Sequence, residues 1–151
     1  MKIIASKNVS SKNGVSKKLC SIALLLTTVF TGCASISPYN AKAYEQATSI
    51  KATALITMTK AQNPYQESAN EIEDLILEMD RAYEYAKGRP KNSESIRQWE
   101  IMKDPEQKLL GGFIQEWKTK QKLNTTYVEL KKKQVGLGFD QIIELEGGKR
   151  K

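Results

Sequence analysis

The 151-residue sequence contains no histidine and has only two cysteines. Without histidine the chain cannot use Ser-His-Asp or Cys-His catalysis, histidine-liganded zinc or a histidine general base. Beyond residue 33, no segment alternates between apolar and polar residues over the length of a strand, and no Asn-Gly turn joins two apolar runs. The phosphate-binding patterns GxxxxGK[ST] and GxGxxG are also missing. These absences exclude several classes of enzyme and favour an all-α fold.

The apolar run from Leu19 to Phe30 is too short to cross a membrane. Its twelve uncharged residues would span about 18 Å as a helix, whereas the hydrocarbon core is about 30 Å thick. Residues 1–18 before it contain five lysines and no acid, and Thr31 and Gly32 after it are small. This order is typical of a secretory signal peptide, so we predict that residues 1–32 are removed. The alternative, a buried core helix, fits the five lysines less well.

The sequence Val29-Phe30-Thr31-Gly32-Cys33 at the end of this run resembles the lipobox of bacterial lipoprotein precursors. Phe30 stands where the family usually has leucine. The resemblance implies cleavage before Cys33 and a diacylglycerol thioether on that cysteine, whose thiolate is the nucleophile that takes the lipid. It implies anchoring to a membrane through acyl chains and no other cofactor. The alternatives are a conventional cleavage site and a chance cysteine.

The residues after Cys33 bear on which membrane is expected. In well-studied Gram-negative bacteria, aspartate at this position favours the inner membrane, whereas here the residues are Ala34 and Ser35. The resemblance therefore implies an outer-membrane lipoprotein that faces the periplasm. The inner membrane and the cell membrane of a Gram-positive bacterium remain alternatives.

Cleavage would change the charge and the thiol content of the chain. The formal charge of +7 includes five lysines of the signal segment, and their removal leaves 19 of the 24 basic residues against 17 acidic ones, a charge of +2. This near-neutral balance gives no electrostatic reason to expect nucleic acid as a partner. Cys20 would leave with the signal segment and Cys33 would become a thioether, so the domain must be stable without a disulfide.

The mature chain is expected to contain a lipidated cysteine and short tether over 33–39, a helical domain over 40–146 and a disordered basic tail over 147–151. One helix is predicted over 40–62, and a second begins at Asn63-Pro64, with Asn63 as N-cap and Pro64 at the first helical position. The apolar stripe of the first helix is Ala43, Ala47, Ile50, Ala54, Met58 and Ala61. The stripe of the second is Tyr65, Ala69, Ile72, Ile76, Met79, Tyr83 and Ala86, and Gly88 and Pro90 end it. A kinked continuation through Pro64 is the alternative.

After residue 93 the sequence predicts shorter helices and then one last long helix. A short helix is expected over 94–103, and Asp104-Pro105-Glu106-Gln107 predicts the start of the next. Gly111-Gly112 indicates either a helix break or a close approach of another backbone. A capping box over 126–129 predicts a last helix that ends near Glu146. The expected fold is a small all-α bundle of three longer helices plus one or two short helices.

Candidate binding residues for a protein partner or lipid are Trp99, Trp117, Lys131, Lys132 and Lys133. Lys118, Lys120 and Lys122 form a second basic region. The competing interpretations are core packing for the tryptophans and ordinary solubilising charges for the lysines.

One face of the second predicted helix carries three acidic residues, Glu71, Asp74 and Glu78. Carboxylates at this spacing could bind calcium or supply an acid/base pair. The competing interpretation is a solvated face. Neither a metal site nor a catalytic residue is predicted. The expected function is non-catalytic: a membrane-anchored lipoprotein that binds an envelope protein near the membrane surface. The alternatives are a cell-wall glycan enzyme that uses Glu or Asp, and a module that binds anionic lipid or lipopolysaccharide.

Overall fold

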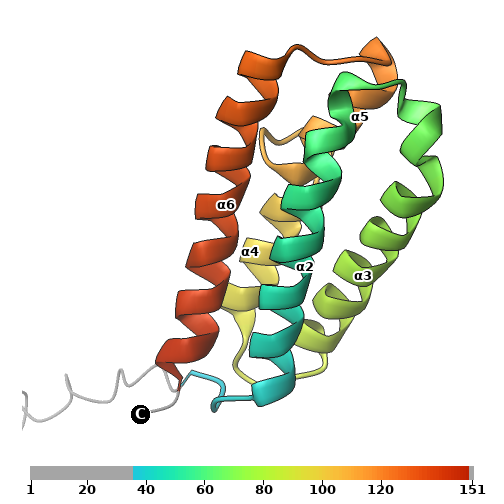
Figure 1. Cartoon of the computed structure of the whole chain (residues 1–151). Helices are drawn as coiled ribbons and strands as arrows, with labels where there is room; N and C mark the ends of the chain where they lie inside the picture. The colour runs from blue at the N-terminus through green and yellow to red at the C-terminus, as the bar shows by residue number, and fades with distance from the viewer. Residues whose placement is uncertain (1–35, 150–151) are drawn as a thin grey trace, which may run out of the picture. The chain divides into compact units, whose positions relative to one another are not determined.

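The all-α prediction is confirmed by a computed structural model that describes residues 36–149 (Figure 1). Within this range there are five α-helices, two short 3-10 helices and no strand. Three helices are long and two are short, as expected. The helices are α2 (Ala41–Thr59), α3 (Ala69–Lys87), α4 (Ser93–Lys103), α5 (Leu110–Lys120) and α6 (Thr125–Gly148), with 3-10 helices η2 (Lys60–Gln62) and η3 (Tyr65–Ser68) between α2 and α3.

The chain reverses between α2 and α3, so the kinked continuation through Pro64 is wrong. Asn63 is extended, with φ −99° and ψ 165°, and Pro64 has ψ 135°, which ends the helical path before η3. Proline disfavours the α conformation for the residue before it, which explains why the break lies here. The predicted start of the second helix at Asn63-Pro64 is also wrong, because the α-helix begins at Ala69. α2 and α3 then run side by side (Figure 1).

The buried stripe of α3 differs from the predicted one. Ile72, Met79 and Ala86 are buried as expected, but Ile76 is 37 % exposed, and Leu75 is only 1 % exposed. The buried residues of the helix are Ile72, Leu75, Met79, Ala82 and Ala86. α3 packs against α2 on one side and α4 on the other. Its buried face is therefore set by two neighbouring helices and not by a single stripe of side chains.

In the α4–α5 connection one prediction is wrong, the cap at Asp104, and one of the two interpretations of Gly111-Gly112 is confirmed. Asp104 does not cap α5, because its Oδ1 accepts a hydrogen bond from Glu106 N at 2.8 Å in a turn, and α5 begins six residues later at Leu110. Gly111 and Gly112 lie in the first turn of α5, where a Cβ would stand 2.2 Å from Lys103 O and 1.8 Å from Gln107 O respectively. The close approach of another backbone is therefore the correct interpretation of the tandem glycine.

The last helix is longer than predicted at both ends. Asn124 is the N-cap, and its Oδ1 accepts from Tyr127 N at 2.8 Å, so the capping box at Thr126 is not used. At the other end α6 continues to Gly148, and Lys149 is only 7 % exposed. The predicted disordered tail is therefore wrong for residues 147–149, because buried hydrogen bonds hold Lys149. Residues 150–151 lie outside the described range.

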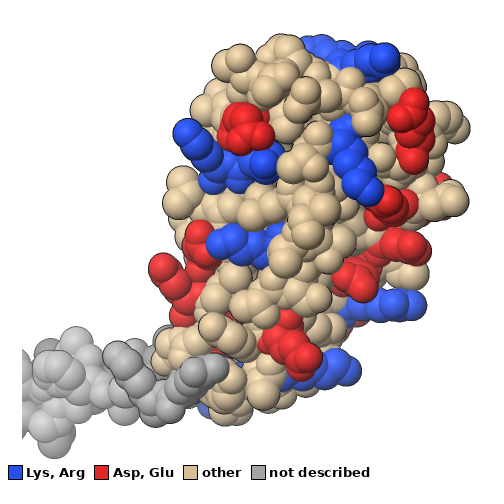
Figure 2. All heavy atoms as spheres, viewed as in Figure 1, with Lys and Arg blue, Asp and Glu red and all other residues tan. Residues whose placement is uncertain are grey.

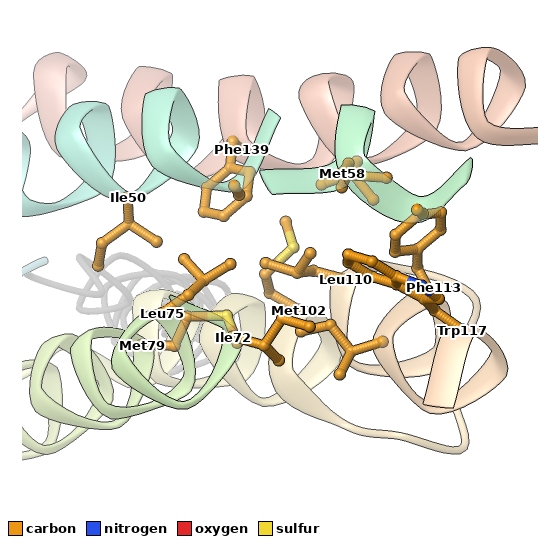
Figure 3. Packing of buried hydrophobic residues seen from close by; sticks show 14 of the residues in the cluster. Ile50, Met58, Ile72, Leu75, Met79, Met102, Leu110, Phe113, Trp117 and Phe139 are labelled. Atoms are coloured by element: carbon orange, nitrogen blue, oxygen red, sulfur yellow. The ribbon is translucent and has the colours of Figure 1, made fainter. Parts of the chain in front are cut away.

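The helices enclose one core that runs along the bundle (Figure 3). Ile50 of α2 and Phe139 of α6 face Leu75 and Met79 of α3 across it, and Met58 of α2 lies further along, near Leu110 and Phe113. Trp117 and Phe113 of α5 fill the end where α2 finishes. At that end Trp117 Nε1 donates to Asn63 O at 3.0 Å, so the largest buried side chain also has its polar atom satisfied.

Candidate functional site

Three chain segments meet at the base of the bundle, which we define by residues 36–42, 87–92 and 143–149 and which is the lower end in Figure 1. Asn40 begins α2 there: its Oδ1 accepts from Ala43 N at 3.0 Å and from the Tyr85 hydroxyl at 3.1 Å. Core packing along α2, α3 and α6 fixes where these helices begin and end. Polar groups that are remote in sequence are therefore brought together at the base.

Five polar side chains, here called the clamp, are buried or nearly so at the base: Arg89, Asn92, Ser95, Glu146 and Lys149. Arg89 Nη1 donates to Glu146 Oε2 at 2.9 Å. Ser95 Oγ and Lys149 Nζ donate to Glu146 Oε1 at 2.6 and 2.7 Å. Lys149 Nζ also donates to Asn92 Oδ1 at 2.7 Å and to Ser95 Oγ at 2.8 Å. Every charge of the clamp is thus paired, as burial requires.

Glu146, which is 2 % exposed, is the centre of the clamp. Burial by itself raises the pKa of the carboxyl group, but hydrogen bonds from Lys149, Ser95 and Arg89 and the charge of Lys149 outweigh it, and the pKa lies below its ordinary value. Glu146 is therefore ionised at neutral pH, and both its oxygens are occupied by donors. The ionised carboxylate therefore binds the side chains of Arg89, Ser95 and Lys149 and joins the chain segments that carry them.

The clamp region also holds the segment ahead of α2. Ser37 N donates to Lys91 O at 2.9 Å, and Tyr39 N donates to Lys149 O at 3.2 Å. Arg89 Nη2 donates to Pro38 O while its other nitrogen bonds Glu146. Residues 36–39 therefore belong to the folded domain, which corrects the expectation of a free tether up to residue 39. Cys33 and the predicted signal segment lie outside the described residues.

A shallow groove of about 490 Å³ lies between α2 and α6. Leu55, Gly136 and Leu137 contribute its apolar surface, and Leu137 is 66 % exposed. Leu130, one heptad before Leu137 on α6, is 54 % exposed. The charged residues around the groove are Lys51, Glu129, Lys132, Lys133 and Asp140. Lys51 pairs with Asp140 and Lys132 with Glu129, and Figure 2 shows cations and anions interspersed on the face where α2 and α6 lie.

The two tryptophans proposed as binding residues lie in the core instead. Trp99 is 3 % exposed and Trp117 is fully buried. Trp99 packs edge-on against Phe139 with ring centroids 6.1 Å apart, and Trp117 packs edge-on against Tyr65 at 5.7 Å. Neither ring is accessible to a partner. Their helical spacing beside other aromatic residues is the signal of core packing.

The three consecutive lysines of α6 do not form one basic surface. Lys131 is 9 % exposed, and its Nζ donates to Lys108 O at 3.0 Å, which ties the α4–α5 connection to α6. Lys132 pairs with Glu129, whereas Lys133 is exposed beside the groove. A helix turns by about 100° per residue, so three adjacent side chains point in different directions.

Glu71, Asp74 and Glu78 do line one groove between α2 and α3, as their spacing predicts. All three are exposed, and Lys60 Nζ pairs with Glu71 at 2.6 Å. Within the described range, no group of three or more histidine, cysteine or acidic residues could hold a metal ion. The three acidic side chains therefore lie on a solvent-exposed face, and the Lys60–Glu71 ion pair crosses the groove.

Glu146, Arg89 and Lys149 were not identified from the sequence, although one signal was present. Phe139, Ile142 and Glu146 follow each other in steps of three and four, which places the glutamate on the buried face of α6. Its neighbour Leu145, the apolar residue at this end of α6, is only half-buried. A carboxylate at a core position indicates a buried cation elsewhere in the chain.

Comparison of the chain with family models, curated proteins and solved structures found no match. Within residues 36–149, no helix has both the length and the apolar character needed to cross a membrane.

Proposed function

We propose that this protein is a non-catalytic envelope lipoprotein, anchored through Cys33, whose helical domain binds a protein partner near the membrane surface. The lipobox-like sequence before Cys33 supports the anchor. The docking of residues 36–39 on the base supports it as well, because it holds the domain next to the attachment point. We further propose that the membrane is the bacterial outer membrane and that the domain faces the periplasm.

The groove between α2 and α6 is the observation that carries the binding proposal. Leu130 and Leu137 are large apolar side chains that stay more than half exposed on α6. Beside them, ion pairs hold Lys51 and Lys132, so a partner that covers the apolar surface meets two cations that are already paired, while Lys133 is exposed beside the groove. The geometry fits an amphipathic helix of another protein, whose apolar side chains would lie over Leu55 and Leu137.

Lipid attachment is tested by metabolic labelling. Cells that express the full chain are grown with radiolabelled palmitate, and the parent is compared with Cys33→Ser. We expect label in the parent alone, because serine lacks the thiolate that forms the thioether. Equal labelling of both proteins, or a precursor that keeps residues 1–32 in both, would contradict the anchor.

The partner proposal is tested by photo-crosslinking in the native cells. A photoreactive amino acid replaces Leu137 in one protein and Leu77 in the control, which is an exposed leucine of α3 (46 %) and lies outside the groove. We expect a discrete protein adduct at position 137, reduced at least about tenfold by Leu130→Lys, and no such adduct at position 77. The same adducts at both positions, or lipid alone at 137, would count against the groove.

A further inference from the structure

The groove between α2 and α6 contains one cation that is not paired with an acidic residue of the described chain. Three cations and two anions line the groove, so its net charge is +1. Lys51 pairs with Asp140, and Lys132 pairs with Glu129. The remaining cation, Lys133, is exposed and forms no ion pair with any residue that the structure describes. The net charge of the groove therefore lies at Lys133.

An unpaired acidic residue lies further along the same side of α6. Glu144 follows Lys133 by eleven residues, which is close to three turns, so the two side chains point to the same side of the helix about 16 Å apart. Leu137 lies between them on that side, and Glu144 is one turn beyond Asp140, which lines the groove. Glu144 is exposed and has no ion pair within the described range. An unpaired cation, an exposed leucine and an unpaired anion therefore follow one another along the groove side of α6.

We infer that the partner segment in this groove is an amphipathic helix with charges in a fixed order: an acidic side chain level with Lys133 and a basic one level with Glu144. The inference rests on the proposed function, because it names the chemistry of the partner at that same groove. A partner that covers Leu137 also removes water from the charges beside it, and an unpaired charge that loses water is costly. Opposite charges on the partner offset that cost and fix the register of its helix. These two charges lie about three turns apart on a helix that follows α6.

Charge reversal tests this order in the native cells. The full chain with the photoreactive amino acid at position 137 receives one further change, Lys133→Glu or Glu144→Lys. We expect either reversal to lower the yield of the protein adduct at least about tenfold, because like charges then face each other across the contact. Lys133→Arg keeps the charge and should keep the yield within about twofold. Each yield is divided by the amount of that variant in the cells, measured by immunoblot.

Lys122→Glu and Glu106→Lys are the matched controls for the two reversals. Both residues are exposed, and neither belongs to α6 or lines the groove. Each control changes the net charge of the protein by the same amount as the variant that it matches, so an effect of net charge alone would appear in both. We expect the controls to leave the adduct yield unchanged. Equal losses in the controls and in the α6 variants would overturn the inference.

The sequence of the crosslinked peptide, read by mass spectrometry, is the second measurement. We expect it to contain an acid and a base about three turns apart, and replacing that acid by lysine in the partner should restore the adduct of Lys133→Glu. A peptide without these charges, or a peptide from a second copy of this chain, overturns the inference. An adduct that is lost with Leu130→Lys but kept with both reversals defeats the inference alone. The absence of any protein adduct at position 137 in the parent defeats the proposed function and the inference together.

Discussion

Glu146→Ala is expected to destabilise the folded domain by roughly 3–5 kcal/mol, the cost of removing one partner from a buried ion pair. The substitution leaves Arg89 and Lys149 as like charges at the base, with side chains that are 10 % and 3 % exposed. The measurement is urea unfolding followed by circular dichroism. The control is Glu144→Gln, an exposed glutamate in the same turn of α6, for which we expect a change within about 0.5 kcal/mol. Similar losses for the two variants would contradict the clamp.

The same carboxyl group predicts a dependence of stability on pH. Its pKa is lower in the folded protein than in the unfolded chain, where an ordinary glutamate titrates near 4.3. The stabilisation is therefore fully present above that ordinary value and is lost as the pH falls through the lower, folded pKa. We expect the parent to lose its advantage over Glu146→Gln in acid. A constant difference between the two proteins from neutral pH to pH 3 would refute this assignment.

Gly112→Ala is expected to destabilise the domain by about 3 kcal/mol or more, at or beyond the upper end of overpacking effects. The new Cβ would stand 1.8 Å from Gln107 O and 3.0 Å from Gln107 C, which are backbone atoms and cannot rotate away. The α4–α5 connection would have to move, and with it Lys108 O, which accepts the hydrogen bond of Lys131. Thermal unfolding of the variant and the parent measures the effect.

Gly136→Ala is the matched control for that substitution. It lies in the interior of α6, and the nearest atom to its new Cβ, Leu55 Cδ1, is 4.0 Å away. Alanine is favoured over glycine inside a helix, so this variant should gain up to about 1 kcal/mol. Two glycines of one protein thus give opposite expected signs. Loss of stability at position 136 equal to that at 112 would show that the close approach is not the cause.

How far the sequence predicts the fold differs between elements. The predicted stripe from Ala47 to Ala61, which runs through α2 into η2, is buried as its spacing indicates, because one face of this segment meets the rest of the bundle. In α3 the spacing was equally regular, yet Leu75 replaces Ile76 in the core, since two neighbouring helices share the inward face. Cap positions were less reliable: Asp104 and Thr126 have the right chemistry for caps, but Leu109 and Asn124 precede the helices.

The candidate site was largely hidden from sequence reasoning. Trp99 and Trp117 were considered as partner residues and are core residues, whereas Glu146 was placed at the end of a helix and is the centre of the clamp. The clamp joins Arg89 to Glu146 over 57 residues and Ser95 to Glu146 over 51. No local pattern encodes a pairing of that range, because it depends on three helices ending at the same place.

The sequence by itself determined the class of fold, the number of long helices and the end of the second long helix at Gly88, and it narrowed Gly111-Gly112 to a helix break or a close approach of another backbone. These follow from the periodicity of apolar residues and from backbone chemistry, both of which act over a few residues. Tertiary structure alone decided which charges are buried, that residues 36–39 join the domain and that Lys149 is held rather than free. Those outcomes depend on where helices end relative to one another, and that is set by packing of the whole core.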